Sequence, residues 1–242
     1  MTRARQTLVG LAFAATVVTA WASVFVWGVF LHRWSAWDLV RVPAVVLLQA
    51  WLGAALFLIA HDAMHGSLAP GRPRLNAIVG QVCVALYAGF SFRKLAAAHH
   101  RHHAAPGLAD DPDFHVADPR GFRGWLWSFF FRYFGWPEFL RLTLGVAVCL
   151  LLGASVANLL VFWAAPALLS ALQLFTFGTY LPHRHEAAPF ADGHRARSLR
   201  QPLWLSFVTC LHFGGFHHEH HLNPGLPWWR LPEARRQSLD HS

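Results

Sequence analysis

Charged residues are scarce in this chain, and lysine is nearly absent. Only 13% of the 242 residues are Asp, Glu, Lys or Arg, and Lys94 is the single lysine. A soluble domain carries roughly 25% charged residues. Hydrophobic residues make up 55%, with 12 Trp and 20 Phe, so the composition indicates a membrane protein. The net charge of +8 does not indicate a nucleic-acid partner, because the arginines flank apolar runs instead of forming one stripe.

Cysteine and glutamate are also sparse, and each scarcity excludes a class of site. Cys83, Cys149 and Cys210 lie far apart in apolar stretches. This excludes a disulfide framework, a zinc knuckle and an iron–sulfur site, and predicts three buried side chains. The few glutamates do not form the Glu-x-x-His pairs of carboxylate-bridged di-iron bundles. No Rossmann glycine fingerprint is present, so a redox enzyme of this sequence would need an external electron donor.

Long apolar runs dominate what is present. Residues 8–31 are too long for the apolar part of a signal peptide, so we interpret them as a retained first transmembrane helix. Residues 39–60 predict a second span. Residues 142–181 predict two more helices joined by a tight hairpin, because Gly153, Ser155 and Asn158 interrupt the run. About four transmembrane helices are therefore expected.

Two further segments are apolar but do not predict a crossing. Residues 76–90 fall short of the roughly 20 residues that a crossing needs. Both of their flanks are basic, which favours a re-entrant or interfacial segment. The aromatic stretch 125–136 predicts a helix lying along the membrane surface. The sequence thus predicts an all-α integral membrane bundle that forms a single domain over residues 1–242. Every histidine-rich segment then lies on the Arg-rich face, as a cytoplasmic cap.

Histidines gather in three clusters on that face, with a fourth piece at a helix end. His61 and His65 are four residues apart, hence about 40° apart on a helix. "HHRHH" at 99–103 and "HHEHH" at 217–221 repeat one pattern, and His183 and His185 follow the last long run. Neutral imidazole is a common ligand for zinc, copper and iron. A polar cap or a basic patch would not require histidine, and one ion cannot use this many ligands. Two metal ions are the economical interpretation.

Helix geometry does not decide which histidines are ligands. With His217 at 0°, His218 lies near 100°, His220 near 300° and His221 near 40°. The sets 217/220/221 and 217/218/221 both span about 100°, and the same tie exists at 99–103. The isolated histidines, by contrast, are expected on the surface: His32, His115, His194, His212 and His241.

The three clusters match H-x3-H, H-x2-H-H and H-x2-H-H, the histidine boxes of the membrane fatty acid desaturase and hydroxylase superfamily. Within it, the chain resembles the bacterial β-carotene ketolases. The similarity rests on "HDAMHGSLAPGRPRLN", "AHHRHHAAPGLADDPDF", "FGTYLPHR" and "HFGGFHHEHHLNPGLPWWRLP". These stretches cover most of residues 61–232.

The resemblance implies a set of iron ligands and breaks the tie in favour of H-x2-H-H. His100 and His218 would not be ligands, and whether His183 or its neighbour His185 is the ninth ligand stays open, with the motif favouring His183. The implied ligands are His61, His65, His99, His102, His103, His183, His217, His220 and His221.

Carboxylates near the boxes are expected to orient the imidazoles and to offset the charge of the ions. The candidates are Asp62, Asp110, Asp111 and Asp113. Two further predictions concern neighbouring residues. Arg101 and Glu219, in the middle of the repeated boxes, could pair with each other. Trp228 and Trp229 look like an interfacial belt.

The resemblance further implies a non-haem di-iron oxygenase that holds two Fe2+ and uses O2. It would oxidise the allylic C4 methylene of a β-ionone ring to a ketone by two successive hydroxylations. A carotenoid would come from the lipid bilayer, and reduced ferredoxin is the implied electron donor. The expected location is the bacterial inner membrane, with the active site on the cytoplasmic side.

Three alternatives remain at the level of sequence. A carotenoid 3-hydroxylase or a fatty acid desaturase or hydroxylase shares the boxes, although the tail from "HHEHH" to "PWWRLP" favours the ketolase. A membrane metal transporter would hold its ligands near the bilayer midplane rather than at helix ends. A bis-histidine haem protein would use paired histidines on facing helices within the membrane.

Overall fold

The structure, a computed structural model, describes residues 1–239, and every regular element in that range is a helix. The predicted all-α class is therefore confirmed. Three helical segments are long and apolar enough to cross a membrane, namely Arg3–Leu31, Asp38–Met64 and Val156–His183. At 1.5 Å per residue, a helix of 27 residues is about 40 Å long and exceeds a hydrocarbon core of roughly 30 Å.

These three segments contain half of the sixteen helical elements in residues 1–239. The first consists of an α-helix and one π-helical turn, and the third alternates between α and π geometry. The elements are α1 (Arg3–Val26), η1 (Trp27–Leu31), α2 (Asp38–Met64), α7 (Val156–Leu159), η2 (Leu160–Ala164), α8 (Ala165–Leu174), η3 (Phe175–Tyr180) and α9 (Leu181–His183).

The predicted break in the run 142–181 is confirmed. Helix α6 (Trp136–Leu151) ends just before Gly153, whose φ of +94° suits a residue without a Cβ atom. Ser155 then caps the next helix, because its hydroxyl accepts a hydrogen bond from the Asn158 amide at 3.1 Å. The sequence signals that suggested a hairpin are therefore the residues that build it.

Two helix pairs are sharply bent. Helix α3 (Pro73–Ala88) meets α4 (Phe92–Ala104) at 98°, and α5 (Phe122–Tyr133) meets α6 at 76°. Each pair is apolar enough to be one broken span or a re-entrant loop, so residues 1–239 contain three to five candidate spans by length and composition. That residues 76–90 do not cross stays a prediction.

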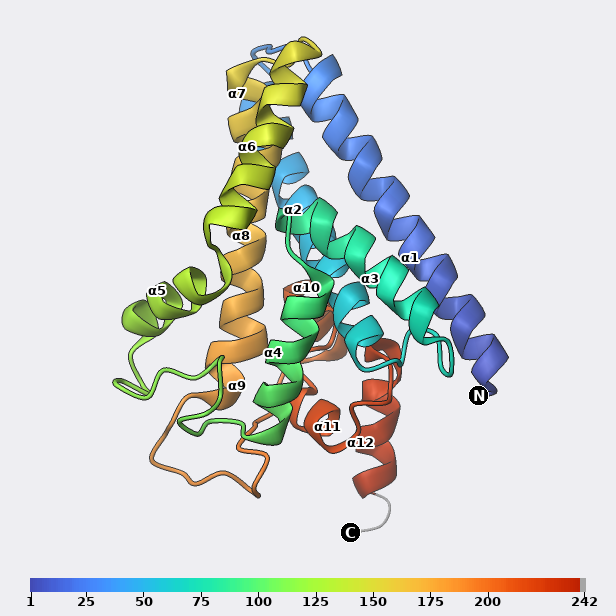
Figure 1. The fold of residues 1–242 in the computed structure, drawn as a ribbon, viewed down its shortest axis with the longest axis vertical. Helices are drawn as coiled ribbons and strands as arrows, with labels where there is room; N and C mark the ends of the chain where they lie inside the picture. Colours follow the sequence, from blue (N-terminus) through green and yellow to red (C-terminus); the bar gives the residue numbers. More distant parts are fainter. Residues whose placement is uncertain (240–242) are drawn as a thin grey trace.

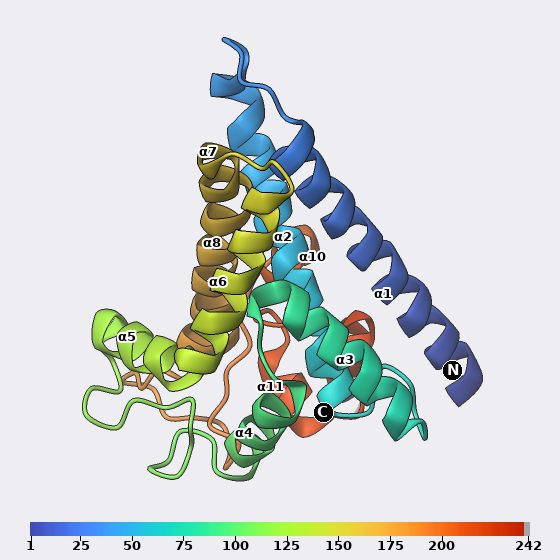
Figure 2. The same ribbon diagram turned by 45° about the horizontal axis from the view of Figure 1, so that its top comes forward.

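The long helices converge at one end of the molecule and spread apart at the other (Figures 1 and 2). Helices α1, α2, α6 and α7 meet at the top of Figure 1. Helix α4, the end of α9 and the last two α-helices of the chain lie toward the bottom, and α10 lies nearer the middle. The C-terminal elements are α10 (Leu203–Cys210), α11 (His217–Leu222), η4 (Trp228–Arg230) and α12 (Leu231–Leu239).

Helix α2 occupies the centre of the bundle. Its C-terminal half is buried nearly all round; Leu56 and Leu58 are fully covered. The outward sides of other helices carry apolar residues instead: Leu144, Leu151 and Leu168 are 66%, 87% and 64% exposed. Such surfaces suit lipid rather than water. Together with the apolar spans they identify a membrane protein.

The predicted environments of several isolated residues can be compared with the structure. The three cysteines are buried and unpaired, as expected. The surface prediction for His32 is wrong, because its side chain is 5% exposed and packs against Phe162 beside Asp38. The interfacial prediction for Trp228 is also wrong, since it is 8% exposed within the core. His241 lies outside the described residues.

Candidate metal centre

The histidine clusters come from four helical elements that end in the same region. His61 lies in the last turn of α2 and His65 caps it; the second cluster lies in the last turns of α4. The third cluster forms the short helix α11, and His183 ends α9. Spacings of three and four residues keep these rings on one side of each helix. The four elements therefore aim their imidazoles inward at one another.

Nine histidines form two adjoining groups in which one ring nitrogen of each member lies within 4.8 Å of those of the others. The first group takes one or more histidines from α2, α4 and α11, and the second takes them from α4, α9 and α11. The members are His61, His65, His99, His103 and His220 in the first, and His102, His183, His217 and His221 in the second. The sequence analysis selected these same nine residues.

Close contacts join the Nε2 atoms within each group. In the first group, the Nε2 atoms of His65 and His99 are 2.7 Å apart. In the second, His217 Nε2 lies 2.8 Å from that of His183 and 3.1 Å from that of His221. His221 Nε2 is in turn 3.3 Å from that of His102.

Hydrogen bonds among the imidazoles cannot satisfy the second group. An imidazole nitrogen is either a donor with one N–H or an acceptor with one lone pair. The Nε2 contacts run in the order His183, His217, His221, His102. Whatever tautomer each ring adopts, one N–H must then serve two acceptors and one lone pair must serve two donors. A cation shared by four lone pairs resolves this conflict. The donor set therefore fits a metal ion.

The ring nitrogens turned away from the second group have fixed partners in two cases. His102 Nδ1 is 3.0 Å from both carboxylate oxygens of Asp111, and His183 Nδ1 lies 2.8 Å from the Arg195 carbonyl oxygen. With Nδ1 as the donor, Nε2 carries the lone pair, which is the tautomer that a metal ligand requires. In the first group, neither ring nitrogen of buried His61 has a hydrogen-bond partner within the described residues.

Burial disfavours the charged form of three histidines in the third cluster. It lowers the pKa values of His217, His220 and His221 well below their usual range, and the neighbouring imidazoles lower them further. Burial raises the pKa of Asp111, but the contact with His102 and the hydrogen bonds from the Gly107 and Asp113 amides together outweigh burial, so the net pKa is lowered. Burial alone would lower the pKa of His102, but the Asp111 and Asp113 carboxylates raise it. His217, His220 and His221 are thus neutral, as metal ligation demands, and the Asp111 carboxylate is charged.

The aspartates differ in how they meet the histidines. Asp111 is 3% exposed, whereas Asp110 is exposed and contributes nothing to the buried network. Asp113 lies 3.8 Å from His102 Nδ1 through one oxygen and accepts a hydrogen bond from the Tyr133 hydroxyl through the other. Asp62 Oδ1 is 3.7 Å from His61 Nδ1, and its Oδ2 accepts from the Trp228 backbone amide at 3.2 Å.

Three histidines of the clusters lie outside both groups. His100 is exposed and its Nε2 meets the Met64 carbonyl at 3.0 Å. His218 Nε2 pairs with Asp192 at 2.8 Å, and His185 packs against Phe114. The two groups therefore contain the histidines of the H-x2-H-H pattern. They also contain His183 and not His185.

The prediction that Arg101 pairs with Glu219 is wrong. Glu219 instead accepts hydrogen bonds from Arg235 and from the Ser198 hydroxyl. Arg235 lies on α12, so the ion pair joins α11 to the C-terminal helix. Sequence spacing could not indicate this, because Arg235 lies 16 residues further along the chain and on a different helix.

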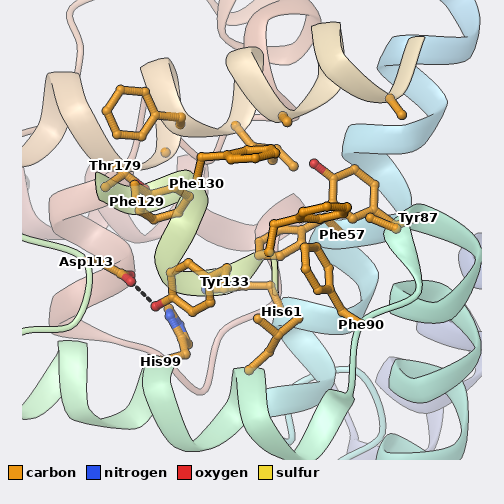
Figure 3. Close-up of a pocket in the computed structure, with 18 of the residues that line it drawn as sticks. Phe57, His61, Tyr87, Phe90, His99, Asp113, Phe129, Phe130, Tyr133 and Thr179 are labelled. Atoms are coloured by element: carbon orange, nitrogen blue, oxygen red, sulfur yellow. Dashed lines mark hydrogen bonds between the residues drawn. The ribbon is translucent and has the colours of Figure 1, made fainter. Parts of the chain in front are cut away.

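An apolar cavity of about 340 Å³ adjoins both histidine groups. Its walls are mostly aromatic and aliphatic, and its histidine end includes His61 and His99 of the first group and His102 and His217 of the second. Figure 3 shows His61, His99 and the Asp113–Tyr133 hydrogen bond among the lining side chains. Tyr133 was missed by the sequence analysis, where it was one aromatic among many in a surface helix.

Comparison with known proteins assigns the chain to a family. The family model described as fatty acid desaturase matches residues 36–145 and 130–241. The chain belongs to the fatty acid desaturase family. This confirms the resemblance that the histidine boxes indicated, and it agrees with the apolar helices of a membrane protein.

Several relatives within this family are similar over most of their length. The β-carotene ketolase of Paracoccus sp. (strain PC1) is 45% identical, covering 96% of this chain and 94% of its own. The β-carotene ketolase of Haematococcus lacustris is 38% identical over 95% of this chain and 79% of its own. A sphingolipid delta(4)-desaturase/C4-monooxygenase of Bos taurus is 30% identical over 76% of this chain. The ketolase similarity is thus the stronger one.

Proposed function

We propose that this protein is a β-carotene 4-ketolase, an oxidoreductase that converts the allylic C4 methylene of a β-ionone ring to a ketone. The observation that carries the proposal is the apolar cavity that ends at four histidines from both groups. A hydrocarbon ring can enter such a cavity without losing hydrogen bonds to water. The similarity to the ketolases, at 45% identity over 96% of the chain, supports the choice of substrate.

Two ferrous ions would be held by the two histidine groups. The five-membered group draws on α2, α4 and α11, and the four-membered group on α4, α9 and α11. Asp111 and the Arg195 carbonyl would keep His102 and His183 in the ligating tautomer. With O2 and electrons from an external donor, the bound iron would supply the oxidant that replaces a C–H bond by C–OH.

The walls of the cavity would exclude water and position the substrate ring. Phe57, Phe90, Phe129 and Phe130 line the cavity and exclude water from the reacting end. Close packing around one ring would hold C4, rather than another carbon, nearest the histidines. C4 is favoured chemically because its C–H bonds are allylic.

The overall reaction requires two rounds at one carbon. Each round consumes one O2, two electrons and two protons, inserts one oxygen atom and releases one water. The first gives the alcohol; the second gives a geminal diol that loses water to form the ketone. We further propose reduced ferredoxin as the donor, because the chain carries no flavin or iron–sulfur motif of its own.

The whole chain would act as one membrane-embedded di-iron oxygenase domain. We place it in the bacterial inner membrane, with the histidine end on the cytoplasmic side. The arginines that flank the apolar runs support this orientation. The carotenoid would reach the cavity from the bilayer.

Expression in a bacterium that makes β-carotene tests the proposal. Chromatography of the pigments should detect echinenone and canthaxanthin. His220→Ala should abolish them, whereas His218→Ala should leave them measurable, because His218 pairs with Asp192 outside both groups. Persistence of β-carotene with no keto-carotenoid, from protein present in the membrane, would refute the function. A product hydroxylated at C3 would assign the chain to the related hydroxylases.

A further inference from the structure

We propose that the Tyr133 hydroxyl retains the half-oxidised substrate, by accepting a hydrogen bond from the alcohol that the first oxidation creates at C4. The inference rests on the proposed ketolase function and adds a residue that acts between its two rounds. It concerns binding of an intermediate, so it requires no oxidant or reductant beyond those already named.

The position of Tyr133 follows from its partners. It is the last residue of α5, and its side chain lines the cavity. Its hydroxyl donates to one carboxylate oxygen of Asp113, whose other oxygen lies 3.8 Å from His102 Nδ1. The Asp113 carboxylate therefore lies between the phenol oxygen and His102, a member of the four-histidine group. Figure 3 draws Tyr133, Asp113 and His99 toward one side of the group of lining side chains, the side at which C4 would be oxidised.

The Asp113 contact decides what the phenol can do for a ligand. A phenol has one O–H donor and lone pairs that accept. Because the Tyr133 O–H donates its hydrogen bond to Asp113, the lone pairs of the phenol oxygen remain free to accept a hydrogen bond from an O–H group inside the cavity. Asp113 also fixes the direction of the phenol, so little rotational freedom is lost when an alcohol binds. An additional tie from α5 to this loop, Trp125 Nε1–H to the Asp113 carbonyl at 2.7 Å, holds the arrangement in place.

The alcohol needs this contact and the hydrocarbon does not. β-Carotene has no polar atom, and the walls around Tyr133 are largely apolar, including Leu126, Phe129 and Phe134. Once C4 bears a hydroxyl, an unpaired O–H in such surroundings is unfavourable, and the ring would be released to reach another partner. Two electrons must arrive before the second round can begin. A held alcohol survives this delay, whereas a free one leaves as a hydroxylated product.

Two other lining hydroxyls are placed differently. Tyr87 lies at the opposite side of the group of side chains in Figure 3 from Asp113. Thr179, from η3, is nearer to Phe129 and is the competing candidate at this end. The test must therefore separate Tyr133 from Thr179.

The test is the ratio of 4-hydroxylated to 4-keto carotenoid made from β-carotene by Tyr133→Phe. Loss of one hydrogen bond between neutral groups should raise this ratio roughly 2- to 10-fold. Tyr180→Phe is the control: the Tyr180 hydroxyl also donates a hydrogen bond, to the Arg120 carbonyl oxygen at 2.7 Å, and Tyr180 is not among the residues that line the cavity. The control should keep the wild-type ratio. An unchanged ratio in Tyr133→Phe, or a rise in Thr179→Val alone, would overturn the inference.

A second measurement uses membranes supplied with each substrate. Tyr133→Phe should raise the KM for added 4-hydroxylated carotenoid by a similar factor and leave the KM for β-carotene unchanged. A purely structural role would change both substrates or lower the amount of protein. In the wild type, the alcohol should inhibit β-carotene oxidation at lower concentration than its 4-methyl ether; equal inhibition would contradict the proposal even if the variant did not fold. Absence of any C4 oxidation by the wild type would overturn the ketolase function itself.

Discussion

Asp111 offers a way to weaken one of the two proposed iron sites while leaving the other intact. Its carboxylate is 3% exposed and faces only donors: the His102 Nδ1–H, the Gly107 amide at 2.8 Å and the Asp113 amide at 2.8 Å. His102 belongs to the four-histidine group alone. Asp111→Asn should therefore affect that group and not the five-histidine group.

The size of the effect follows from the hydrogen bonds. Each Asp111 oxygen accepts a hydrogen bond from one backbone amide. The NH2 group of an asparagine would therefore face the backbone N–H of either Gly107 or Asp113, donor against donor. A buried donor left unpaired costs about 1–3 kcal/mol. His102 also loses the negative charge that favours electron density at Nε2. Loss of such a partner typically lowers metal affinity about 10- to 100-fold, which equals roughly 1.4–2.8 kcal/mol.

The iron affinity of each site is measured by anaerobic titration with Fe2+ of metal-depleted protein in detergent. The wild type should bind two ions per chain. Asp111→Asn should retain one site of unchanged affinity and show a second weakened by about 10- to 100-fold. Asp110→Asn is the control, because the neighbouring carboxylate is exposed. Equal weakening of both sites, or no weakening in protein of wild-type helical content, would refute the assignment of Asp111 to one group.

Three further outcomes are expected. Gly80→Ala should destabilise the purified protein by about 1–3 kcal/mol and so lower its thermal midpoint, because a Cβ there would overlap the Phe92 ring. Gly193→Ala is the control and should leave the midpoint unchanged, because a Cβ there would have no neighbour within 4 Å. Ser155→Ala should cost about 1 kcal/mol in the same assay through loss of the cap at Asn158, and an unchanged midpoint would contradict the capping role. Purified protein with O2 and iron should make no ketone until an electron donor is added; turnover without one would disprove the external donor.

Much of the framework could be predicted from local sequence. Apolar run lengths gave the long helices, and Gly153 with Ser155 marked the turn between α6 and α7 because both act within a few residues. Histidine spacing placed His61 and His65 on one face of their helix and showed that three histidines of each later cluster could share a face, without deciding which three. These features depend on helix geometry, which a sequence specifies directly.

The parts that could not be predicted depend on partners far along the chain. Helix geometry left His218 equivalent to its neighbours, and its pairing with Asp192, 26 residues away, is what takes it out of the cluster. His32 was expected on the surface, yet Phe162 covers it from a helix more than a hundred residues later.

Tyr133 makes the same point for the reaction itself. Within "WLWSFFFRYFGW" nothing distinguishes it from an interfacial aromatic, and its importance arises only because α5 folds back so that its last residue meets Asp113, 20 residues earlier. By accepting the phenol O–H, one carboxylate oxygen of Asp113 orients Tyr133 as a hydrogen-bond acceptor at the edge of an apolar cavity. If the held alcohol is what separates a ketone-forming site from one that stops at the alcohol, the difference lies in the wall of the cavity rather than in the histidines.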